Sequence, residues 1–314
     1  MPQRSFLIGT RQSRLAVRQT EIVLESLRSA HPDVSLEVRT VRTTGDDSPA
    51  SLGEIGGRGV FVIELEQALL AGDIDIAVHS LKDLPSRETV GLTIAAVGRR
   101  EEPRDAIVAR DGLALADLPP SATVGSGSPR RVAQLLALRP DLRVADIRGN
   151  VDTRIRKVQD GEYDAVIVAA AGLVRLGWLE RATELLPLDV MLPAVGQGAL
   201  AVQVRADDVE AMDLVQAADD LPTRVATAAE RAFERGLGAC LPDGSAGCQA
   251  AIAALGEVAG DRLRLRGLVA DPAGDRLLRD EVEGPSRDGE LLGAGLAGRL
   301  LEQGAAALHL AAAS

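Results

Sequence analysis

The sequence of 314 residues contains few aromatic residues, few cysteines and few lysines. Phe, Trp and Tyr together make up 2% of the residues, so we expect a core of Ala, Val, Leu and Ile within a hydrophobic content of 46%. The two cysteines, Cys240 and Cys248, lie without clustered histidines and are too few for a zinc site, so we expect no metal. Nearly all the basic residues are arginine; the lysines are Lys82 and Lys157.

Long apolar runs are also missing. None approaches the roughly 20 residues that a membrane span requires, and the N-terminal residues lead into a strand pattern without the apolar core of a signal peptide. The net charge of −11 argues against general nucleic-acid binding. We therefore expect a cytoplasmic protein without a membrane or nucleic-acid partner, and no structural disulfide.

The most informative segment joins a buried strand to a polar turn. Apolar residues alternate from Ile74 to Val78 and predict the strand, and Pro85 prevents a regular continuation. Ligands of α/β sheets bind at the carboxyl ends of strands. A serine, a lysine and an aspartate therefore stand where a site is expected, although a plain polar turn is the alternative. The polar residues of this turn are His79, Ser80, Lys82 and Asp83, and we interpret the histidine as structural.

Strand and helix patterns alternate through the first part of the chain and start again after a charged, proline-containing run at 99–104. This alternation predicts doubly wound α/β domains, and the charged run is a plausible hinge. The segment 192–205 is interpreted as a crossing segment and a strand that returns toward the first domain.

The C-terminal part of the chain has a different pattern. A helix is expected at 222–237, and three strand-like runs follow at 249–255, 262–269 and 276–282, separated by glycine-containing turns. This spacing predicts an antiparallel meander. A single helix at 289–308 is expected to close the chain, which gives an α+β domain.

Arginine recurs beside glycine or serine at several predicted strand-to-helix junctions. Helix N-termini bind anions through free N–H groups, and arginine pairs bidentately with carboxylates or phosphates. One such junction is more often a solvated helix start, but several on a two-domain scaffold favour a polyanionic ligand. The sequence has no Gly-Lys-Ser/Thr phosphate loop and does not by itself distinguish carboxylate from phosphate. The residues are Arg11, Ser13, Ser128, Arg130, Arg131, Arg148 and Arg154.

Asp83 is an acidic residue in this basic set. It can accept hydrogen bonds from N–H groups, stabilise a developing cation or move a proton. A structural salt bridge to a neighbouring Arg or Lys is an equal alternative. Cys248 and Cys240 both lie among small residues, where each can be a buried small side chain or a point of covalent attachment.

Together these segments closely resemble the hydroxymethylbilane synthases, also called porphobilinogen deaminases. Six motifs match in order and cover the chain densely up to about residue 235. The motifs are Gly-Thr-Arg-Gln-Ser-Arg-Leu-Ala at 9–16, His-Ser-Leu-Lys-Asp-Leu-Pro at 79–85, Val-Gly-Ser-Gly-Ser-Pro-Arg-Arg at 124–131, Arg-Gly-Asn-Val-Asp-Thr-Arg at 148–154, Ala-Gly-Leu at 171–173 and Leu-Pro-Ala-Val-Gly-Gln-Gly at 192–198.

The resemblance implies a three-domain α/β fold. Two periplasmic-binding-protein-like, doubly wound domains with mixed sheets form the cofactor and substrate cleft, and a small C-terminal α+β domain carries a three-stranded antiparallel sheet. We expect domain 1 at 1–98 and 194–217, domain 2 at 104–190 and domain 3 at 221–314.

The resemblance also implies a monomeric transferase of tetrapyrrole biosynthesis. Four molecules of porphobilinogen are joined head to tail on a covalent dipyrromethane cofactor, each losing ammonia, and water releases the linear tetrapyrrole hydroxymethylbilane. The cofactor is held by a thioether to a cysteine of domain 3. A non-catalytic two-lobe protein that binds a polycarboxylate is the competing function.

By the same resemblance the basic set binds the acetate and propionate groups of cofactor and substrate, joined by Ser80, Lys82 and Arg175. Asp83 is the expected catalytic residue, facing the pyrrole N–H groups. Arg58 and Phe61 lie on the active-site loop of the family.

Two features depart from the family pattern. Members commonly have lysines in the active-site loop, where this chain has Glu54 and Arg58. Near the attachment site, Cys240 has the better distance from the preceding helix, whereas Cys248 has the better following sequence. An inserted loop at 241–247 would reconcile the two, and we favour Cys248 with Cys240 as the alternative.

Overall fold

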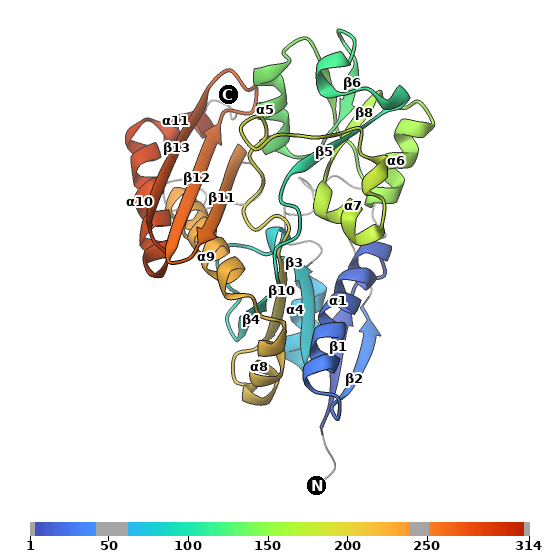
Figure 1. The fold of residues 1–314 in the computed structure, drawn as a ribbon, viewed down its shortest axis with the longest axis vertical. Helices are drawn as coiled ribbons and strands as arrows, with labels where there is room; N and C mark the ends of the chain where they lie inside the picture. Colours follow the sequence, from blue (N-terminus) through green and yellow to red (C-terminus); the bar gives the residue numbers. More distant parts are fainter. Residues whose placement is uncertain (1–3, 42–61, 239–250, 311–314) are drawn as a thin grey trace. The chain divides into compact units, whose positions relative to one another are not determined.

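The computed structural model describes residues 4–41, 62–238 and 251–310 (Figure 1). The chain divides into two compact units. Unit 1 comprises Met1–Arg100 and Ala199–Arg224, and unit 2 comprises Glu101–Gly198 and Val225–Ser314. The residues expected to form domains 2 and 3 thus lie largely in one unit, and the three-domain division stays a prediction.

Unit 1 is built on a five-stranded sheet with the order β2-β1-β3-β10-β4. The first three of these strands are parallel, and β10 is antiparallel to both of its neighbours. Its strands are β1 Ser5–Thr10, β2 Ser35–Thr40, β3 Ile76–Ser80, β4 Leu92–Val97 and β10 Leu200–Arg205, and its helices are α1 Arg14–Ala30, α4 Ile63–Ala71 and α8 Val209–Val215.

Alternation along β3 determines which helix covers which face of this sheet. Ile76 and Val78 belong to the same core cluster as Leu27 of α1. Ala77 belongs instead to the cluster of Leu65 and Leu69, on α4. Successive strand residues point to opposite faces, so α1 and α4 lie on opposite sides of the sheet, and Ser80 points to the α1 side.

Unit 2 contains a second five-stranded sheet with the order β7-β6-β8-β5-β9. It repeats the pattern of unit 1, because β7, β6 and β8 are parallel and β5 is antiparallel to both of its neighbours. The elements are β5 Asp105–Ala109, β6 Thr123–Gly125, α5 Pro129–Leu138, β7 Arg143–Ala145, α6 Val151–Gln159, β8 Ala165–Ala169, α7 Ala170–Leu176 and β9 Glu184–Leu185.

The C-terminal part of unit 2 is an antiparallel sheet, β11-β12-β13, with helices. Phe233 is fully buried between the helices and the sheet, in one cluster with Leu265 and Leu300. Ala133 of α5 packs in another cluster with Ala253 of the sheet. The elements are α9 Leu221–Gly238, β11 Ala251–Ala259, β12 Arg262–Ala270, β13 Leu277–Pro285, α10 Gly289–Glu302 and α11 Ala305–Leu310.

One expected helix is divided in the structure. The single helix predicted at 289–308 is wrong, because α10 ends at Glu302 and α11 begins at Ala305. Gly304 between them has a φ of +96°, which a helix does not allow and which glycine adopts at low cost. Short 3₁₀ helices connect other elements: η2 Leu81–Asp83, η3 Arg110–Gly112, η4 Leu115–Asp117, η5 Leu179–Arg181, η6 Gln216–Ala218 and η7 Ser286–Asp288.

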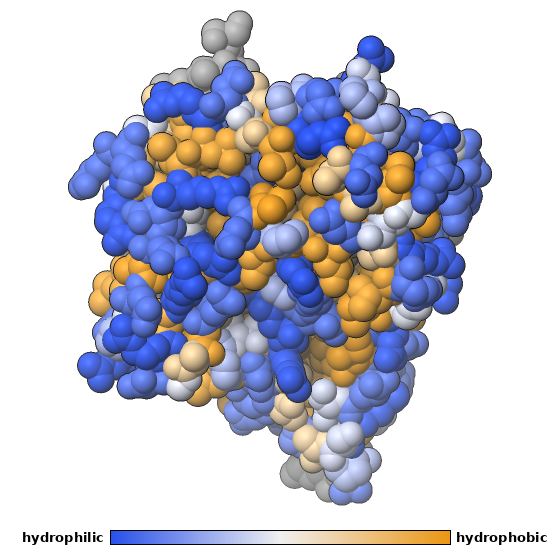
Figure 2. All heavy atoms as spheres, turned by 45° about the horizontal axis from the view of Figure 1, so that its top comes forward, coloured by the Kyte–Doolittle hydropathy of each residue, from blue (hydrophilic) through white to orange (hydrophobic). Residues whose placement is uncertain are grey.

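These elements confirm the predicted fold class, two α/β domains with mixed sheets and a three-stranded antiparallel sheet. None of the described helices combines the length and the apolar character needed to cross a membrane. On the face drawn in Figure 2, hydrophilic residues cover most of the surface and hydrophobic groups lie between them. Such a mixture is usual, since apolar atoms contribute about half of the surface of folded proteins.

Candidate active site

In unit 1, the predicted site residues gather at one edge of the sheet. β1 and β3 are parallel neighbours, with Gly9 opposite Ala77, so their carboxyl ends lie together. Five predicted residues lie at or just after these two strand ends: Arg11, Ser13, Ser80, Lys82 and Asp83.

Two hydrogen bonds fix the serines at this edge. Ser13 is the N-cap of α1, and its Oγ accepts a hydrogen bond from the N–H of Ala16 at 3.2 Å. Gln19, one turn further along α1, donates from Nε2 to Oγ of Ser80 at 2.8 Å. Because Gln19 is buried and directs this bond at the oxygen, the Ser80 hydroxyl keeps its own proton for another acceptor.

The turn after β3 is anchored by its apolar residues. Leu81 and Leu84 are buried, the N–H of Leu81 donates to the carbonyl of Ala199 at 3.0 Å, and the N–H of Leu84 donates to the carbonyl of Leu81 at 3.1 Å. Lys82 and Asp83 between them are half-buried. Among the described residues, nothing forms a hydrogen bond or ion pair with the Asp83 carboxylate. The alternative of a structural salt bridge therefore finds no support in this part of the chain.

His79 lies on the other face of β3 and is buried. Burial disfavours the imidazolium and lowers the pKa of His79 to about 4; the side chain of Gln203 opposes this shift and the charge of Arg11 adds to it. Gln203 in turn donates to Glu66 of α4 at 2.9 Å. These contacts agree with the structural role expected for this histidine.

In unit 2 the predicted residues also gather at one sheet edge. Val124 of β6 is opposite Val144 of β7 and Ala165 of β8, and all three strands run the same way. The helices that follow them begin at that edge. These helices, or the residues just before them, include the predicted residues Ser128, Arg130, Arg131, Arg148, Arg154 and Arg175.

Two of these arginines are buried against an aspartate that sequence reasoning missed. Arg130 and Arg131 are 4% and 6% exposed, and both form ion pairs with Asp105, which is 0% exposed. Asp105 begins β5, whose antiparallel pairing places it opposite Ala169 at the end of β8. In the sequence, Asp105 reads as one more charge after the charged run at 99–104, since its partners are 25 and 26 positions away.

The other arginines of unit 2 are partly exposed. Arg148 donates from Nε to Asp146 at 2.8 Å, and Arg154 donates from Nε to the carbonyl of Gly149 at 2.8 Å. Arg175 donates from Nη2 to the carbonyl of Gly198 at 2.6 Å. Burial lowers the pKa of Arg175 to about 10, partly offset by Glu101, and the residue remains cationic at neutral pH.

Ser128 is the N-cap residue of α5, and Pro129 is its first helical residue. The side chain of Ser128 makes no capping hydrogen bond, in contrast to Ser13. Its backbone N–H donates to Oγ of Ser126 at 3.3 Å. The Ser128 hydroxyl is therefore not engaged in holding the helix end.

Four predicted residues lie outside the described residues: Arg58, Phe61, Cys240 and Cys248. The described chain nevertheless limits where the two cysteines attach to the fold. α9 ends at Gly238, two residues before Cys240, and β11 begins at Ala251, three residues after Cys248.

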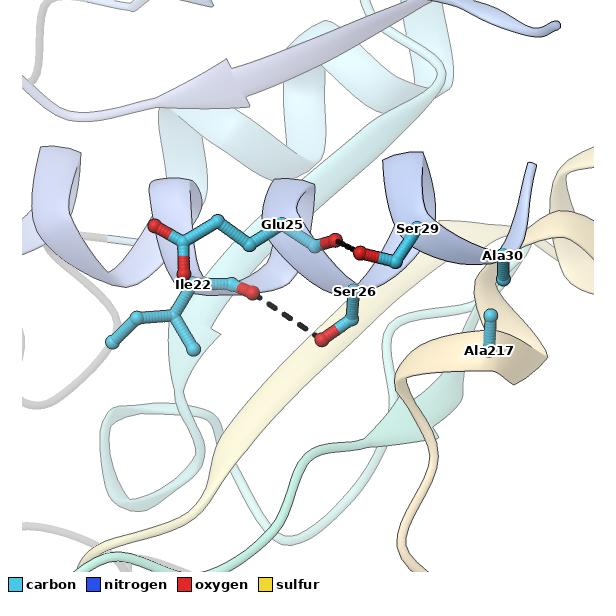
Figure 3. Close-up of a pocket in the computed structure, with 6 residues that line it drawn as sticks. All are labelled: Ile22, Glu25, Ser26, Ser29, Ala30 and Ala217. Atoms are coloured by element: carbon cyan, nitrogen blue, oxygen red, sulfur yellow. Dashed lines mark hydrogen bonds between the residues drawn. The ribbon is translucent and has the colours of Figure 1, made fainter. Parts of the chain in front are cut away.

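A surface hollow in unit 1 is separate from these edges (Figure 3). It runs along the C-terminal half of α1, whereas the predicted residues stand before the first turn of that helix. Its two serine hydroxyls already donate to backbone carbonyls, Ser26 to Ile22 at 3.4 Å and Ser29 to Glu25 at 2.7 Å. We therefore do not include it in the candidate site.

Comparison with known proteins gives a match over nearly the whole chain. The family model described as "Porphobilinogen deaminase, dipyromethane cofactor binding domain" matches residues 6–213, and "Porphobilinogen deaminase, C-terminal domain" matches residues 225–302. A porphobilinogen deaminase of Roseiflexus sp. (strain RS-1) is 48% identical over 309 residues, which are 98% of this chain and 99% of that protein. The enzyme named so in Thermobifida fusca is 49% identical over 95% of this chain and 93% of its own length.

Among solved structures, the VFT2 domain of Bordetella pertussis BvgS is similar at a TM-score of 0.43 and 18% identity. The match covers 68% of this chain and 86% of that domain. This likeness is too weak to support an argument about fold or function.

Proposed function

Because the chain belongs to the porphobilinogen deaminase family, we propose roles for its residues in the reaction of that family. The enzyme is a transferase, a hydroxymethylbilane synthase, that condenses four porphobilinogen molecules head to tail with loss of ammonia. The match of both family domains over nearly the full length carries this conclusion. The competing function, a non-catalytic binder of polycarboxylates, is not favoured by it.

The donor groups at the two sheet edges fit a dipyrromethane cofactor. This group carries several carboxylates, and the edges present arginine, lysine and serine donors, with Arg130 and Arg131 held almost entirely out of water. Arginine pairs bidentately with carboxylates, and such bonds are stronger where solvent is excluded. When bound, the cofactor would supply the primer to which the enzyme adds porphobilinogen units. The groups proposed to hold it and the substrate are Arg11, Ser13, Ser80, Lys82, Ser128, Arg130, Arg131, Arg148, Arg154 and Arg175.

Asp83 is the proposed catalytic residue. When the C–N bond of the porphobilinogen aminomethyl group breaks, ammonia leaves and positive charge spreads over the pyrrole to its N–H. A fixed carboxylate accepting that N–H stabilises the charge. The methylene carbon that has lost ammonia then bonds to the free α-carbon of the terminal pyrrole of the growing oligopyrrole. That ring carbon must lose its proton, which Asp83 can take up and pass on.

The neighbours of Asp83 would help in different ways. Lys82, on the same short turn, would pair with a carboxylate of the ligand or modulate the charge of Asp83. Ser80 would donate its hydroxyl proton to a ligand carboxylate, since Gln19 occupies the oxygen. Arg58 and Phe61 are proposed to act from the active-site loop.

Cys248 is the proposed attachment point of the cofactor, with Cys240 as the alternative. Mass spectrometry of the intact protein should show an adduct of two pyrrole units, and peptide mapping should assign it to Cys248. Cys248→Ala should lack the adduct, and the matched variant Cys240→Ala should keep it. If Cys240→Ala lacks the adduct and Cys248→Ala keeps it, Cys240 is the attachment point. A folded protein with both thiols free that does not consume porphobilinogen would overturn the enzyme function itself.

We also propose that the enzyme acts as a cytoplasmic monomer without a nucleic-acid partner. The net charge of −11 supports the last point, and the low cysteine count suits a reducing compartment. Light scattering coupled to gel filtration should give a mass near 32.8 kDa. Twice that mass would contradict the monomer.

A further inference from the structure

We propose that Asp105 is a positioning residue that orients Arg130 and Arg131 for the carboxylates of the ligand. The inference rests on the proposed function, in which these arginines bind the ligand. Asp105 itself matches none of the six family motifs and was not among the predicted site residues.

The carboxylate of Asp105 is the centre of a buried hydrogen-bond network. Its Oδ2 accepts from Nη1 of Arg130 at 2.8 Å, and its Oδ1 accepts from Nη2 and Nε of Arg131 at 2.7 and 3.1 Å. Oδ1 also accepts from Nε2 of Gln197 at 3.0 Å. Four donors from three side chains therefore converge on one carboxylate and set the direction of both guanidinium groups.

Backbone carbonyls complete the orientation of the two arginines. Nη1 of Arg130 also donates to the carbonyl of Leu192 at 2.7 Å, and Nη1 of Arg131 donates to the carbonyl of Ile167 at 3.0 Å. These carbonyls are fixed parts of the fold. A guanidinium held from two sides in this way loses little rotational freedom when a ligand binds, which increases affinity.

The charges of the cluster are suited to an anionic ligand. Asp105 carries one negative charge and contacts two positive ones. Burial raises the pKa of Asp105, but the charges and hydrogen bonds of Arg130 and Arg131 outweigh burial and hold the pKa well below its ordinary value. Asp105 therefore stays ionised at neutral pH, and a ligand carboxylate would add a second negative charge beside the arginine pair.

Asp105 also links two segments of unit 2 that lie near crossings of the chain between the units. It lies a few residues after the entry into unit 2 at Arg100–Glu101, while Gln197 lies just before the exit at Gly198–Ala199. Nε2 of Gln197 bonds both Asp105 and the carbonyl of Pro103, at 3.0 and 2.7 Å. The network that orients the arginines thus also fixes both crossing segments within unit 2.

The test is a double-mutant cycle of Asp105→Asn and Arg131→Gln, measured with porphobilinogen as the substrate. Arg131→Gln should raise KM about tenfold if that arginine binds the ligand. Asp105→Asn should also raise KM about tenfold, with kcat of the loaded enzyme changed less than about threefold. The increase in KM of the double variant should be smaller than the product of the two single increases, because Asp105 acts partly through Arg131. The fraction of purified protein that carries the cofactor, measured by intact mass, should fall in both single variants.

The outcomes separate the two proposals. If Arg131→Gln leaves KM and cofactor loading unchanged, the ligand role of the arginines is wrong. If Arg131→Gln has its effect and a folded Asp105→Asn does not, the positioning role of Asp105 is wrong. Asp141→Asn, which removes a surface ion pair with Arg139, is the matched control and should behave as wild type.

A second variant covers the case in which Asp105→Asn does not fold. Asp105→Glu keeps the charge but displaces the carboxylate by one methylene. It should raise KM about threefold and lower cofactor loading, because the guanidinium groups turn with the carboxylate. A folded Asp105→Glu with the KM and loading of wild type would overturn the inference.

Discussion

Unit 1 and unit 2 each present a carboxylate at the sheet edge where the predicted residues gather. Asp83 of unit 1 is half-buried on a one-turn 3₁₀ helix, and no described residue pairs with it. Asp105 of unit 2 is fully buried and accepts four hydrogen bonds. Both sheets have the same pattern, three parallel strands and then a strand that is antiparallel to both of its neighbours. The two carboxylates therefore differ in burial and in the number of their donors, although the sheets share one pattern, and this difference fits the separate roles that we propose for them.

The largest expected effect is the loss of turnover when the carboxylate of Asp83 is replaced. Asp83→Asn should fold and carry the cofactor but lose turnover by about 10²–10⁴-fold, because it can neither offset positive charge nor accept a proton. Steady-state consumption of porphobilinogen measures the loss. Asp73→Asn, an exposed aspartate just before β3, is the control and should keep wild-type activity. Retained activity in Asp83→Asn would remove this residue from the mechanism.

The next effect is on stability and should appear in unit 2. Asp105→Ala leaves two arginines buried without their common carboxylate, and breaking such a pair lowers the free energy of unfolding by about 3–5 kcal/mol. Asp83→Ala should change it by less than about 0.5 kcal/mol. Urea unfolding of both variants gives the comparison. Equal losses would mean that Asp83 also has a structural partner.

A third prediction concerns His79, the buried histidine near the end of β3. His79 is neutral when folded, with its pKa lowered to about 4, whereas the unfolded chain takes up a proton below about pH 6.5. The contribution of His79 to the free energy of unfolding should therefore be fully present above about pH 6.5. The free energy of unfolding should fall by up to about 3 kcal/mol as the pH drops toward 4.

Urea unfolding at pH 7 and pH 5 measures this dependence. His79→Gln should reduce it, while His31→Gln, at the end of α1, should leave it as in wild type. Asp105 in unit 2 has its pKa lowered below that of an ordinary carboxyl, so its contribution is lost only at more acidic pH. If His79→Gln loses as much unfolding free energy between pH 7 and pH 5 as wild type does, the pH dependence arises from another group.

The smallest expected effect is the difference in stability between variants of the two N-cap serines, Ser13 and Ser128. Ser13→Ala removes the capping bond of α1 and should lower the free energy of unfolding by about 1 kcal/mol. Ser128→Ala removes no such bond and should cost less than about 0.5 kcal/mol. Thermal unfolding distinguishes them. A larger loss for Ser128→Ala would indicate a capping role that its N–H geometry does not reveal.

Periodicity in the sequence predicted most of the fold. The strands at both sheet edges and the three-stranded meander follow from alternating apolar residues, and α9 occurs close to the expected bounds of 222–237. Shorter elements were missed: α7, α8 and β9 have seven, seven and two residues. Segments of that length contain too few repeats to define a period.

The candidate site was predictable from the sequence where its residues lie close together along the chain. Ser80, Lys82 and Asp83 share one turn, so a single motif identifies them. Asp105 was not predictable, because its role depends on partners that only the pairing of β5 with β8 brings near. Gln19 was missed for the same reason: its partner Ser80 is 61 positions away.

The position of β10 has a consequence for how the enzyme is made. β10 lies between β3 and β4, and the N–H of Leu81, at the start of the turn that includes Asp83, donates to the carbonyl of Ala199, just before β10. On the ribosome, β3 and β4 emerge more than a hundred residues earlier than their shared neighbour. Contacts between such distant segments form slowly. The turn that carries Asp83 therefore cannot be completed until both five-stranded sheets have been synthesised as far as β10.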